Sequence, residues 1–256
     1  MRTWLIQICL AVSVLSASSF AGEITVAAAA DLQYALKEVA ARFEKESGNT
    51  VKLTFGSSGN FYSQIANGAP FDVFLSADSE YPKKLIEAGA ADRNSLFVYG
   101  VGRIVLWVPG ASKLDLNKGL KVLLDPAVRK VALANPQHAP YGRAAVAALR
   151  HEGLYDQVSG KFVFGENISQ TMHFIESGNV DAGFVALSLA TAPPTQGRGR
   201  YWVVPQDFYP TIEQAAVVIS HSPKKKTASA FLDFLRKPEI VELMGRYGFE
   251  RPGSKR

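Results

Sequence analysis

The stretch FGSSGNF at residues 55–61, followed by GAPFDVFLSAD at residues 68–78, decides how this chain folds. An apolar strand predicted at 51–55 runs into a turn of small residues, and a helical pattern opens at the two serines. The first N–H groups of a helix have no partner within the helix, and the helix dipole makes that end positive. Small hydroxylated residues there allow an anion to approach the backbone closely. The stretch therefore predicts an anion-binding helix start.

The same arrangement recurs at other places along the chain. A strand predicted at 23–29 leads into a helix that starts near Asp31. The loop NPQHAPYG at 135–142 and the segment GENISQ at 165–170 also lie between a predicted strand and a predicted helix. We expect these four turns, two from each half of the chain, to converge on one small ligand.

The first 21 residues are predicted to be a secretory signal and not part of the fold. Arg2 gives a short charged start, residues 5–15 are apolar, and Ser19-Phe20-Ala21 matches a small-x-small cleavage site. The alternative is a buried N-terminal helix. We expect cleavage after Ala21 and an exported, soluble product.

Composition argues against several classes of function. Cys9, the only cysteine, lies inside the predicted signal, so we expect no disulfide, thiol nucleophile or cysteine metal site in the mature chain. The formal net charge is +5, and removing Arg2 leaves +4. No stripe of Lys and Arg alternates with aromatic residues, so nucleic acid is not an expected partner. Outside the site loops, the histidines at 151, 173 and 221 show no metal-ligand spacing.

Strands and helices alternate along the rest of the chain, which predicts α/β layers with a largely parallel sheet. The apolar run at 97–108 is longer than a typical strand and is predicted to cross between two lobes. We expect residues 22–102 plus 213–256 to form lobe 1 and residues 103–212 to form lobe 2, with the ligand cleft between the lobes. Residues 192–200, rich in Pro, Gly and Thr, are predicted to be a surface loop.

Six segments occur in the order found in a known family. ITVAAAADLQYALKEVAARFEKESG, FGSSGNFYSQIANGAPFDVFLSAD, ANPQHAPYG, ENISQ, SGNVDAGFVA and RYGF together resemble the periplasmic molybdate-binding proteins of ABC importers. The resemblance spans essentially the whole mature chain. It implies a type II periplasmic binding protein fold that closes over a tetrahedral oxyanion, held by neutral hydroxyl and N–H groups.

The resemblance also implies the ligand and the partners. The ligand would be molybdate and also tungstate, with molybdenum bound as molybdate and no direct protein–metal ligands. No cofactor and no catalytic residue are expected. The protein would be a periplasmic monomer that delivers its ligand to the permease of an ABC importer. A sensor or scavenger with the same fold is an alternative that the sequence leaves open.

The site residues follow from the same resemblance. Ser58 would donate its hydroxyl and its N–H, Ala77 and Ile168 would donate their N–H groups, and Tyr141 would donate its hydroxyl. Some relatives place the ligand tyrosine where this chain has Ala186, but this chain is similar to those with a tyrosine at 141. Without the resemblance, the serines would be ordinary helix caps and the tyrosine a packed loop aromatic.

Asp31 occupies the first-loop position of the site, where relatives carry Ser or Asn. Two unit charges 4 Å apart repel by roughly 4 kcal/mol at an effective dielectric constant near 20, and by about twice that if one is a dianion. Such repulsion would cancel most of a micromolar affinity of about 8 kcal/mol. Three interpretations remain open. Asp31 is a helix cap that accepts the N–H of Gln33 or Tyr34, or a protonated donor, or the reason for a different ligand.

A secreted serine hydrolase is the competing class of function. Ser57 or Ser58 would be the nucleophile and one of the four histidines the base. The segment GSSG at 56–59 does not match the G-x-S-x-G elbow, however. His138 lies in the site loop and is expected at the surface or behind the ligand contacts.

Overall fold

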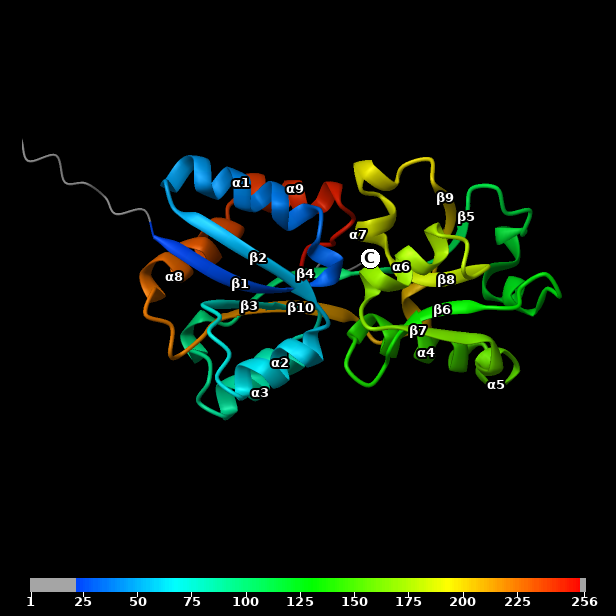
Figure 1. The fold of residues 1–256 in the computed structure, drawn as a ribbon, viewed down its shortest axis with the longest axis horizontal. Helices are drawn as coiled ribbons and strands as arrows, with labels where there is room; N and C mark the ends of the chain where they lie inside the picture. Colours follow the sequence, from blue (N-terminus) through cyan, green and yellow to red (C-terminus); the bar gives the residue numbers. More distant parts are fainter. Residues whose placement is uncertain (1–21, 254–256) are drawn as a thin grey trace, which may run out of the picture.

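The computed structural model describes residues 22–253, which form two five-stranded sheets side by side, each covered by helices (Figure 1). The strand orders are β2-β1-β3-β10-β4 and β7-β6-β8-β5-β9. We call the first sheet with its helices lobe 1 and the second with its helices lobe 2. The predicted signal peptide at 1–21 lies outside the described residues.

Lobe 1 contains the N-terminal and C-terminal parts of the chain. Its strands are β1 (Glu23–Ala29), β2 (Thr50–Gly56), β3 (Val73–Ser76), β4 (Phe97–Gly102) and β10 (Ile212–Val218). Its helices are α1 (Ala35–Ser47), α2 (Ser58–Ala66), α3 (Glu80–Glu87), α8 (Lys225–Leu235) and α9 (Pro238–Arg246), with 3-10 turns η1 (Ala30–Leu32) and η2 (Arg93–Ser95). In Figure 1, α1, α8 and α9 lie on one side of this sheet, and α2 and α3 lie on the other.

Lobe 2 contains the middle of the chain. Its strands are β5 (Ile104–Pro109), β6 (Val131–Ala134), β7 (Phe162–Gly165), β8 (Ala182–Ala186) and β9 (Gly199–Val203). Its helices are α4 (Pro140–His151), α5 (Tyr155–Val158), α6 (Ile168–Glu176) and α7 (Leu187–Ala190), with 3-10 turns η3 (Leu116–Leu124), η4 (Ser159–Lys161), η5 (Pro193–Thr195) and η6 (Gln206–Phe208).

The sheets are mixed, so the prediction of a largely parallel sheet is wrong for half of the pairings. β1 pairs in parallel with β2 and β3, and β6 pairs in parallel with β7 and β8. These strands are joined by helical crossovers within one lobe, which impose the parallel direction. β10 and β5 are antiparallel to both of their neighbours. Each of these two strands follows a segment that arrives from the other lobe, and it therefore enters its sheet from the opposite end.

Two segments connect the lobes. The apolar run at 97–108 divides at Arg103 into β4 of one sheet and β5 of the other, so it crosses as its length predicts. The second crossing joins β9 to β10 through residues 204–211. Strand β9 begins within the region 192–200 that was predicted to be only a loop. It is an edge strand with three exposed residues, so it lacks the apolar pattern of a buried strand.

The core of lobe 1 follows the two-residue period of a central strand. Ile24, Val26 and Ala28 of β1 pack into the cluster that includes α1 and α8, whereas Ala27 packs toward α2 and α3. Both faces of β1 are therefore buried, and its carboxyl end is fixed at the side of the sheet that faces lobe 2. Within residues 22–253, no helix has the length and apolar character needed to cross a membrane.

Candidate functional site

A small cavity lies between the lobes, at the point where several helices begin. Its lining comes from both lobes and consists of Ala29, Ala30, Asp31, Gly56, Ser57, Ser58, Ala77, Ala139, Pro140, Tyr141, Asn167 and Ile168. All five residues predicted from the resemblance therefore meet at one place. The cavity has about 10 Å³ of free volume, enough for about one water molecule. A tetrahedral oxyanion has five heavy atoms, so its entry requires the lobes or the lining side chains to move.

The first wall of the cavity is the start of α2. Ser57 is the N-cap, and its Oγ accepts the N–H of Asn60 at 3.4 Å. Ser58 follows as the first helical residue, so its N–H has no partner within the helix. The Ser58 Oγ accepts the Ala77 N–H at 2.9 Å. Because that bond uses an acceptor position of the hydroxyl, the hydroxyl proton of Ser58 remains available for a ligand.

Two helices of lobe 2 start at the opposite wall. α4 has Pro140 at its first position and Tyr141 next, and α6 starts at Ile168. The Asn167 side chain caps α6 by accepting the N–H groups of Ser169 and Gln170, both at 3.0 Å. The cap leaves the Ile168 N–H outside the intrahelical pattern. Three positive helix ends, those of α2, α4 and α6, therefore surround the cavity.

Asp31 is not a helix cap, so that interpretation is wrong. It lies in η1, whose N-cap is Ala29 and has no side-chain cap bond, and α1 begins only at Ala35. The Asp31 carboxylate turns toward lobe 2, where its Oδ2 accepts the Tyr141 hydroxyl at 2.9 Å. It also accepts the amide of Gln214 Nε2 at 2.7 Å. The backbone carbonyl of Asp31 also makes a contact with lobe 2, because it accepts the Ser188 hydroxyl at 2.8 Å.

The Asp31 carboxyl is 1 % exposed, and its Oδ1 makes no hydrogen bond of ordinary geometry within residues 22–253. Burial raises the pKa of this carboxyl from 3.8 to about 6. The hydrogen bonds from Gln214 and Tyr141, and the N–H groups of Asp31 and Leu32, act in the opposite direction on the pKa. Desolvation outweighs these donors.

Gln214 and Tyr99 belong to this network, and sequence reasoning missed both. Gln214 Nε2 also donates to the Tyr141 oxygen at 2.8 Å, and Tyr99 donates to Gln214 Oε1 at 2.8 Å. Gln214 is fully buried, although it lies in the otherwise apolar segment QAAVV of β10. The sequence could have revealed Gln214, because a single amide side chain in an otherwise apolar strand needs hydrogen-bond partners when it is buried. Burial raises the pKa values of Tyr99 and Tyr141 well above their usual range, so both remain neutral donors.

Direct contacts hold the lobes together around the cavity. The Gly59 N–H donates to the His138 carbonyl at 2.9 Å, and His138 Nδ1 lies 2.9 Å from Ser57 Oγ. The Asn60 amide donates to Glu166, whose carboxylate is also 3.7 Å from His138 Nε2. The hydroxyl of Ser169 donates to Gln33 at another point on the rim. The structure is therefore a closed conformation, and His138 lies in the closing contact itself.

Residues 24–250 match the family model described as bacterial extracellular solute-binding protein. The chain belongs to this family. This solute-binding protein is 42% identical to the molybdate-binding protein ModA of Rhodobacter capsulatus over 235 residues, which cover 92% of this chain and 91% of that protein. It is 39% identical to the molybdate-binding protein ModA of Azotobacter vinelandii, over 94% of this chain and 95% of that protein.

The solved structures agree with the sequence relatives. The periplasmic molybdate-binding protein of Azotobacter vinelandii superimposes on this solute-binding protein with a TM-score of 0.85 and 35% identity, over 90% of this chain and 99% of that chain. This match establishes the predicted two-lobed periplasmic binding protein fold. The sulfate-binding protein SubI of Mycobacterium tuberculosis has a TM-score of 0.76 at 17% identity and supports the fold alone.

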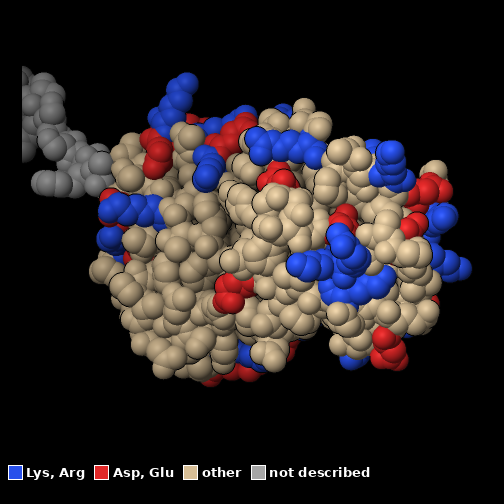
Figure 2. All heavy atoms as spheres, turned by 45° about the vertical axis from the view of Figure 1, so that its right-hand side comes forward, with Lys and Arg blue, Asp and Glu red and all other residues tan. Residues whose placement is uncertain are grey.

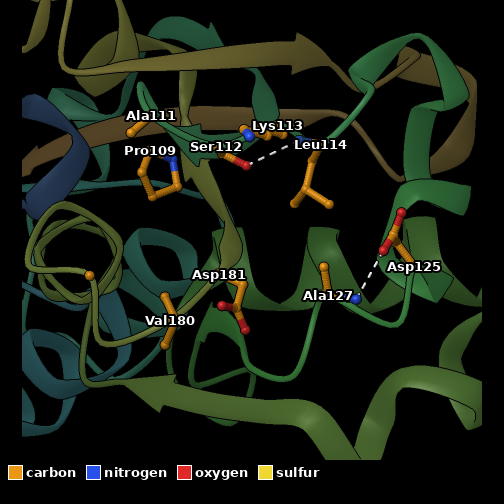
Figure 3. Close-up of a pocket in the computed structure, with 10 residues that line it drawn as sticks. Pro109, Ala111, Ser112, Lys113, Leu114, Asp125, Ala127, Val180 and Asp181 are labelled. Carbon is orange, nitrogen blue, oxygen red and sulfur yellow. Dashed lines mark hydrogen bonds between the residues drawn. The ribbon is translucent and has the colours of Figure 1, made fainter.

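A larger hollow of about 470 Å³ lies in lobe 2, away from the cavity between the lobes. Figure 3 shows Pro109, Ser112 and Leu114 on one side of it and Val180 and Asp181 on the other. Its carboxylates are already used, since Asp125 accepts the Ala127 N–H and Asp181 accepts two backbone N–H groups, at 2.9, 2.8 and 2.9 Å. We assign no ligand to it. Figure 2 shows that Lys and Arg gather on part of the same lobe, with acidic side chains among them.

Proposed function

We propose that this solute-binding protein captures molybdate, and tungstate as well, for delivery to an ABC importer. The observation that carries the proposal is the convergence of the α2, α4 and α6 starts and the Ser58 hydroxyl on one cavity between two lobes. Relatives named for molybdate binding, at 39% identity and above over nearly the whole chain, support it. Export, signal cleavage after Ala21, a periplasmic location and action as a monomer belong to the same proposal.

The proposed ligand contacts are neutral donors. Ser58 would give its hydroxyl and N–H, Tyr141 its hydroxyl, Ile168 its N–H, and Ala77 an N–H that now donates to Ser58. Of the described residues that line the cavity, none is a lysine or an arginine. A dianion would thus be bound by desolvated dipoles from both lobes, each oxygen gaining its full set of donors only when the lobes close. Sulfate should then bind poorly, because its oxygens lie closer to the central atom and would not reach donors on both walls of a cavity sized for molybdate.

The experiment is a calorimetric titration of the mature protein with molybdate, tungstate and sulfate. We expect tight binding of the first two and weak binding of sulfate. Ser58→Ala should weaken molybdate binding by about 1–3 kcal/mol, because a donor to a charged group is lost. Ser169→Ala, at the rim, is the matched control and should have a smaller effect. Equal affinities for the wild type and Ser58→Ala would show that the assigned site is wrong.

The contact between Ser57 and His138 is the one observation that favours a serine hydrolase. It does not form a nucleophile–base pair of the usual kind. The Ser57 hydroxyl already caps α2, and Glu166 is 3.7 Å from the ring with a side chain that is 55% exposed. We therefore expect no labelling of the protein by a fluorophosphonate. Stoichiometric labelling at Ser57 would favour the enzyme.

A further inference from the structure

Asp31 brings a buried carboxyl group to the wall of the cavity that is proposed to bind a dianion. Its Oδ2 is occupied by two donors, Gln214 Nε2 and the Tyr141 hydroxyl, at 2.7 and 2.9 Å. Its Oδ1 has no ordinary hydrogen bond within the described part of the chain and is fully shielded from solvent. Asp31 lines the cavity, and Oδ1 is the carboxyl oxygen that neither Gln214 nor Tyr141 uses.

Tyr141 has a single hydroxyl proton, and it donates that proton to Asp31. The Gln214 amide occupies an acceptor position on the same hydroxyl at 2.8 Å. While Asp31 is ionised, the Tyr141 hydroxyl can donate its one proton either to Asp31 or to an oxyanion, but not to both. A proton on Asp31 removes this competition in either position. On Oδ1 it is donated directly to the ligand, and on Oδ2 it is donated to the Tyr141 oxygen, which releases the Tyr141 proton to the ligand.

We propose that Asp31 takes up one proton from solvent when the oxyanion binds, and that Gln214 is the positioning residue that holds Asp31 and Tyr141 for this exchange. The inference rests on the proposed function and deepens it. The step balances: a hydronium ion or buffer acid in the solvent gives up a proton, one O–H bond forms on the carboxylate, and no other covalent bond of the protein or the oxyanion changes. The cavity then holds the charge of the dianion alone, without a third negative charge beside it.

The surroundings of Asp31 favour this exchange over neutralisation by a cation. The groups that face its side chain are neutral: Tyr141 from α4, Gln214 from β10 and, one step behind, Tyr99 from β4. From α7, Ser188 contributes a hydroxyl to the Asp31 carbonyl. Burial has already moved the carboxyl pKa to about 6, so the proton is gained at small cost near neutral pH. The charged groups on neighbouring loops are used elsewhere: Asp78 pairs with Arg143, and Glu166 faces His138.

The test is calorimetric titration with molybdate at pH 7.5 in buffers of different ionisation enthalpy, which counts the protons taken up. We expect about one proton per molybdate bound. The association constant should then fall about tenfold per pH unit above the pKa of Asp31, or about 100-fold between pH 7 and pH 9. In Asp31→Asn, proton uptake should vanish and the affinity should be the same at both pH values.

Three further variants make the assignment specific. His138→Asn removes an ionisable side chain from the closing contact and should keep the pH slope. Asp115→Asn, at the exposed cap of η3, is the chemical control and should behave as the wild type. Gln214→Met removes a donor that lowers the pKa of Asp31, so the onset of the slope should move to higher pH. An unchanged onset would overturn the positioning role of Gln214.

The outcomes separate the two proposals. Molybdate binding by the wild type with no proton uptake and equal affinity at pH 7 and pH 9 would overturn the inference and leave the proposed function intact. A slope that persists in Asp31→Asn and disappears in His138→Asn would also overturn it, because the proton would then belong to His138. No molybdate binding at any pH from 5.5 to 9 would overturn both.

Discussion

At the scale of single residues, Asp31 should also govern stability. Its pKa in the folded protein, about 6, lies above the usual 3.8, so the folded state binds more protons than the unfolded state between these values. Stability is therefore lost as the pH rises from about 4 to 6, by about 3 kcal/mol at most.

Asp31→Asn should regain that free energy at pH 8 and little of it near pH 4. Without molybdate, urea unfolding at the two pH values measures the difference. Asn can still accept the bonds from Gln214 and Tyr141 through its amide oxygen. An equal gap between wild type and variant at both pH values would mean that Asp31 does not titrate with folding.

The Gln214 and Tyr141 side chains that bind Asp31 lie in space that a side chain at Gly102 would fill. A Cβ added there would lie 2.5 Å from Gln214 Nε2 and even closer to the Tyr141 oxygen. Gly102→Ala must therefore displace Gln214 or Tyr141, and we expect at least a tenfold loss of molybdate affinity by calorimetry. Gly100→Ala on the same strand is the matched control, since its nearest new contact is an ordinary 3.5 Å to Phe249. Similar losses in both variants would point to strand distortion instead.

At the scale of elements, α2 meets the loop before α4 only because Gly59 has no side chain. A Cβ at Gly59 would lie 2.7 Å from the His138 Cβ and 2.6 Å from the Tyr81 hydroxyl oxygen. Gly59→Ala should leave both lobes folded, because Ala is favourable within a helix. It should prevent full closure, because the new Cβ would collide with His138 of the other lobe. We expect a weaker affinity for molybdate and a larger radius of gyration by X-ray scattering at saturating ligand.

Gly245→Ala is the control for that experiment, because a Cβ at this position in α9 meets nothing within 4 Å. It should close as the wild type does. If Gly59→Ala bound and closed normally, the contact between Gly59 and His138 would not be part of closure.

The elements with a strong apolar period were predictable, and those that depend on the other lobe were not. The strand at 23–29 was predicted at its observed bounds and the strand at 51–55 within one residue at each end, because each is an apolar run next to turn residues. The bend at Asp31 was not, since local propensity favours a cap there and the bonds that oppose it come from Tyr141 and Gln214, more than 100 residues away. The separation of two residues along the sequence does not indicate how far apart they lie in the folded protein.

At the scale of the whole molecule, closure combines several weak contacts. Arg143 of α4 donates to Asp78 at 2.5 Å and to the Tyr81 hydroxyl at 3.3 Å, so it links lobe 2 to lobe 1. Its side chain is 37% exposed, and such ion pairs contribute about 0–1 kcal/mol. Arg143→Gln should therefore weaken molybdate binding by less than about fivefold, and the loss should shrink in high salt. A loss as large as that of Ser58→Ala would assign Arg143 a direct role at the ligand.

The two ends of the described chain differ in how close they lie to the segments that connect the lobes. β1 begins at the outer end of lobe 1, whereas the last residues return to the middle of the molecule, where Glu250 bridges Val101 and pairs with Arg103 at 2.7 Å (Figure 1). Arg103 separates the strands of the first crossing, so the C-terminal residues contact a segment that connects the two lobes. A fluorophore, surface anchor or affinity tag placed after residue 253 would therefore lie close to the segment that must bend if the lobes open and close. The same group joined to the N-terminal end of the mature chain would lie beside β1, at the outer end of lobe 1 and away from both crossings, which makes this end the better attachment point for a sensor built from the protein.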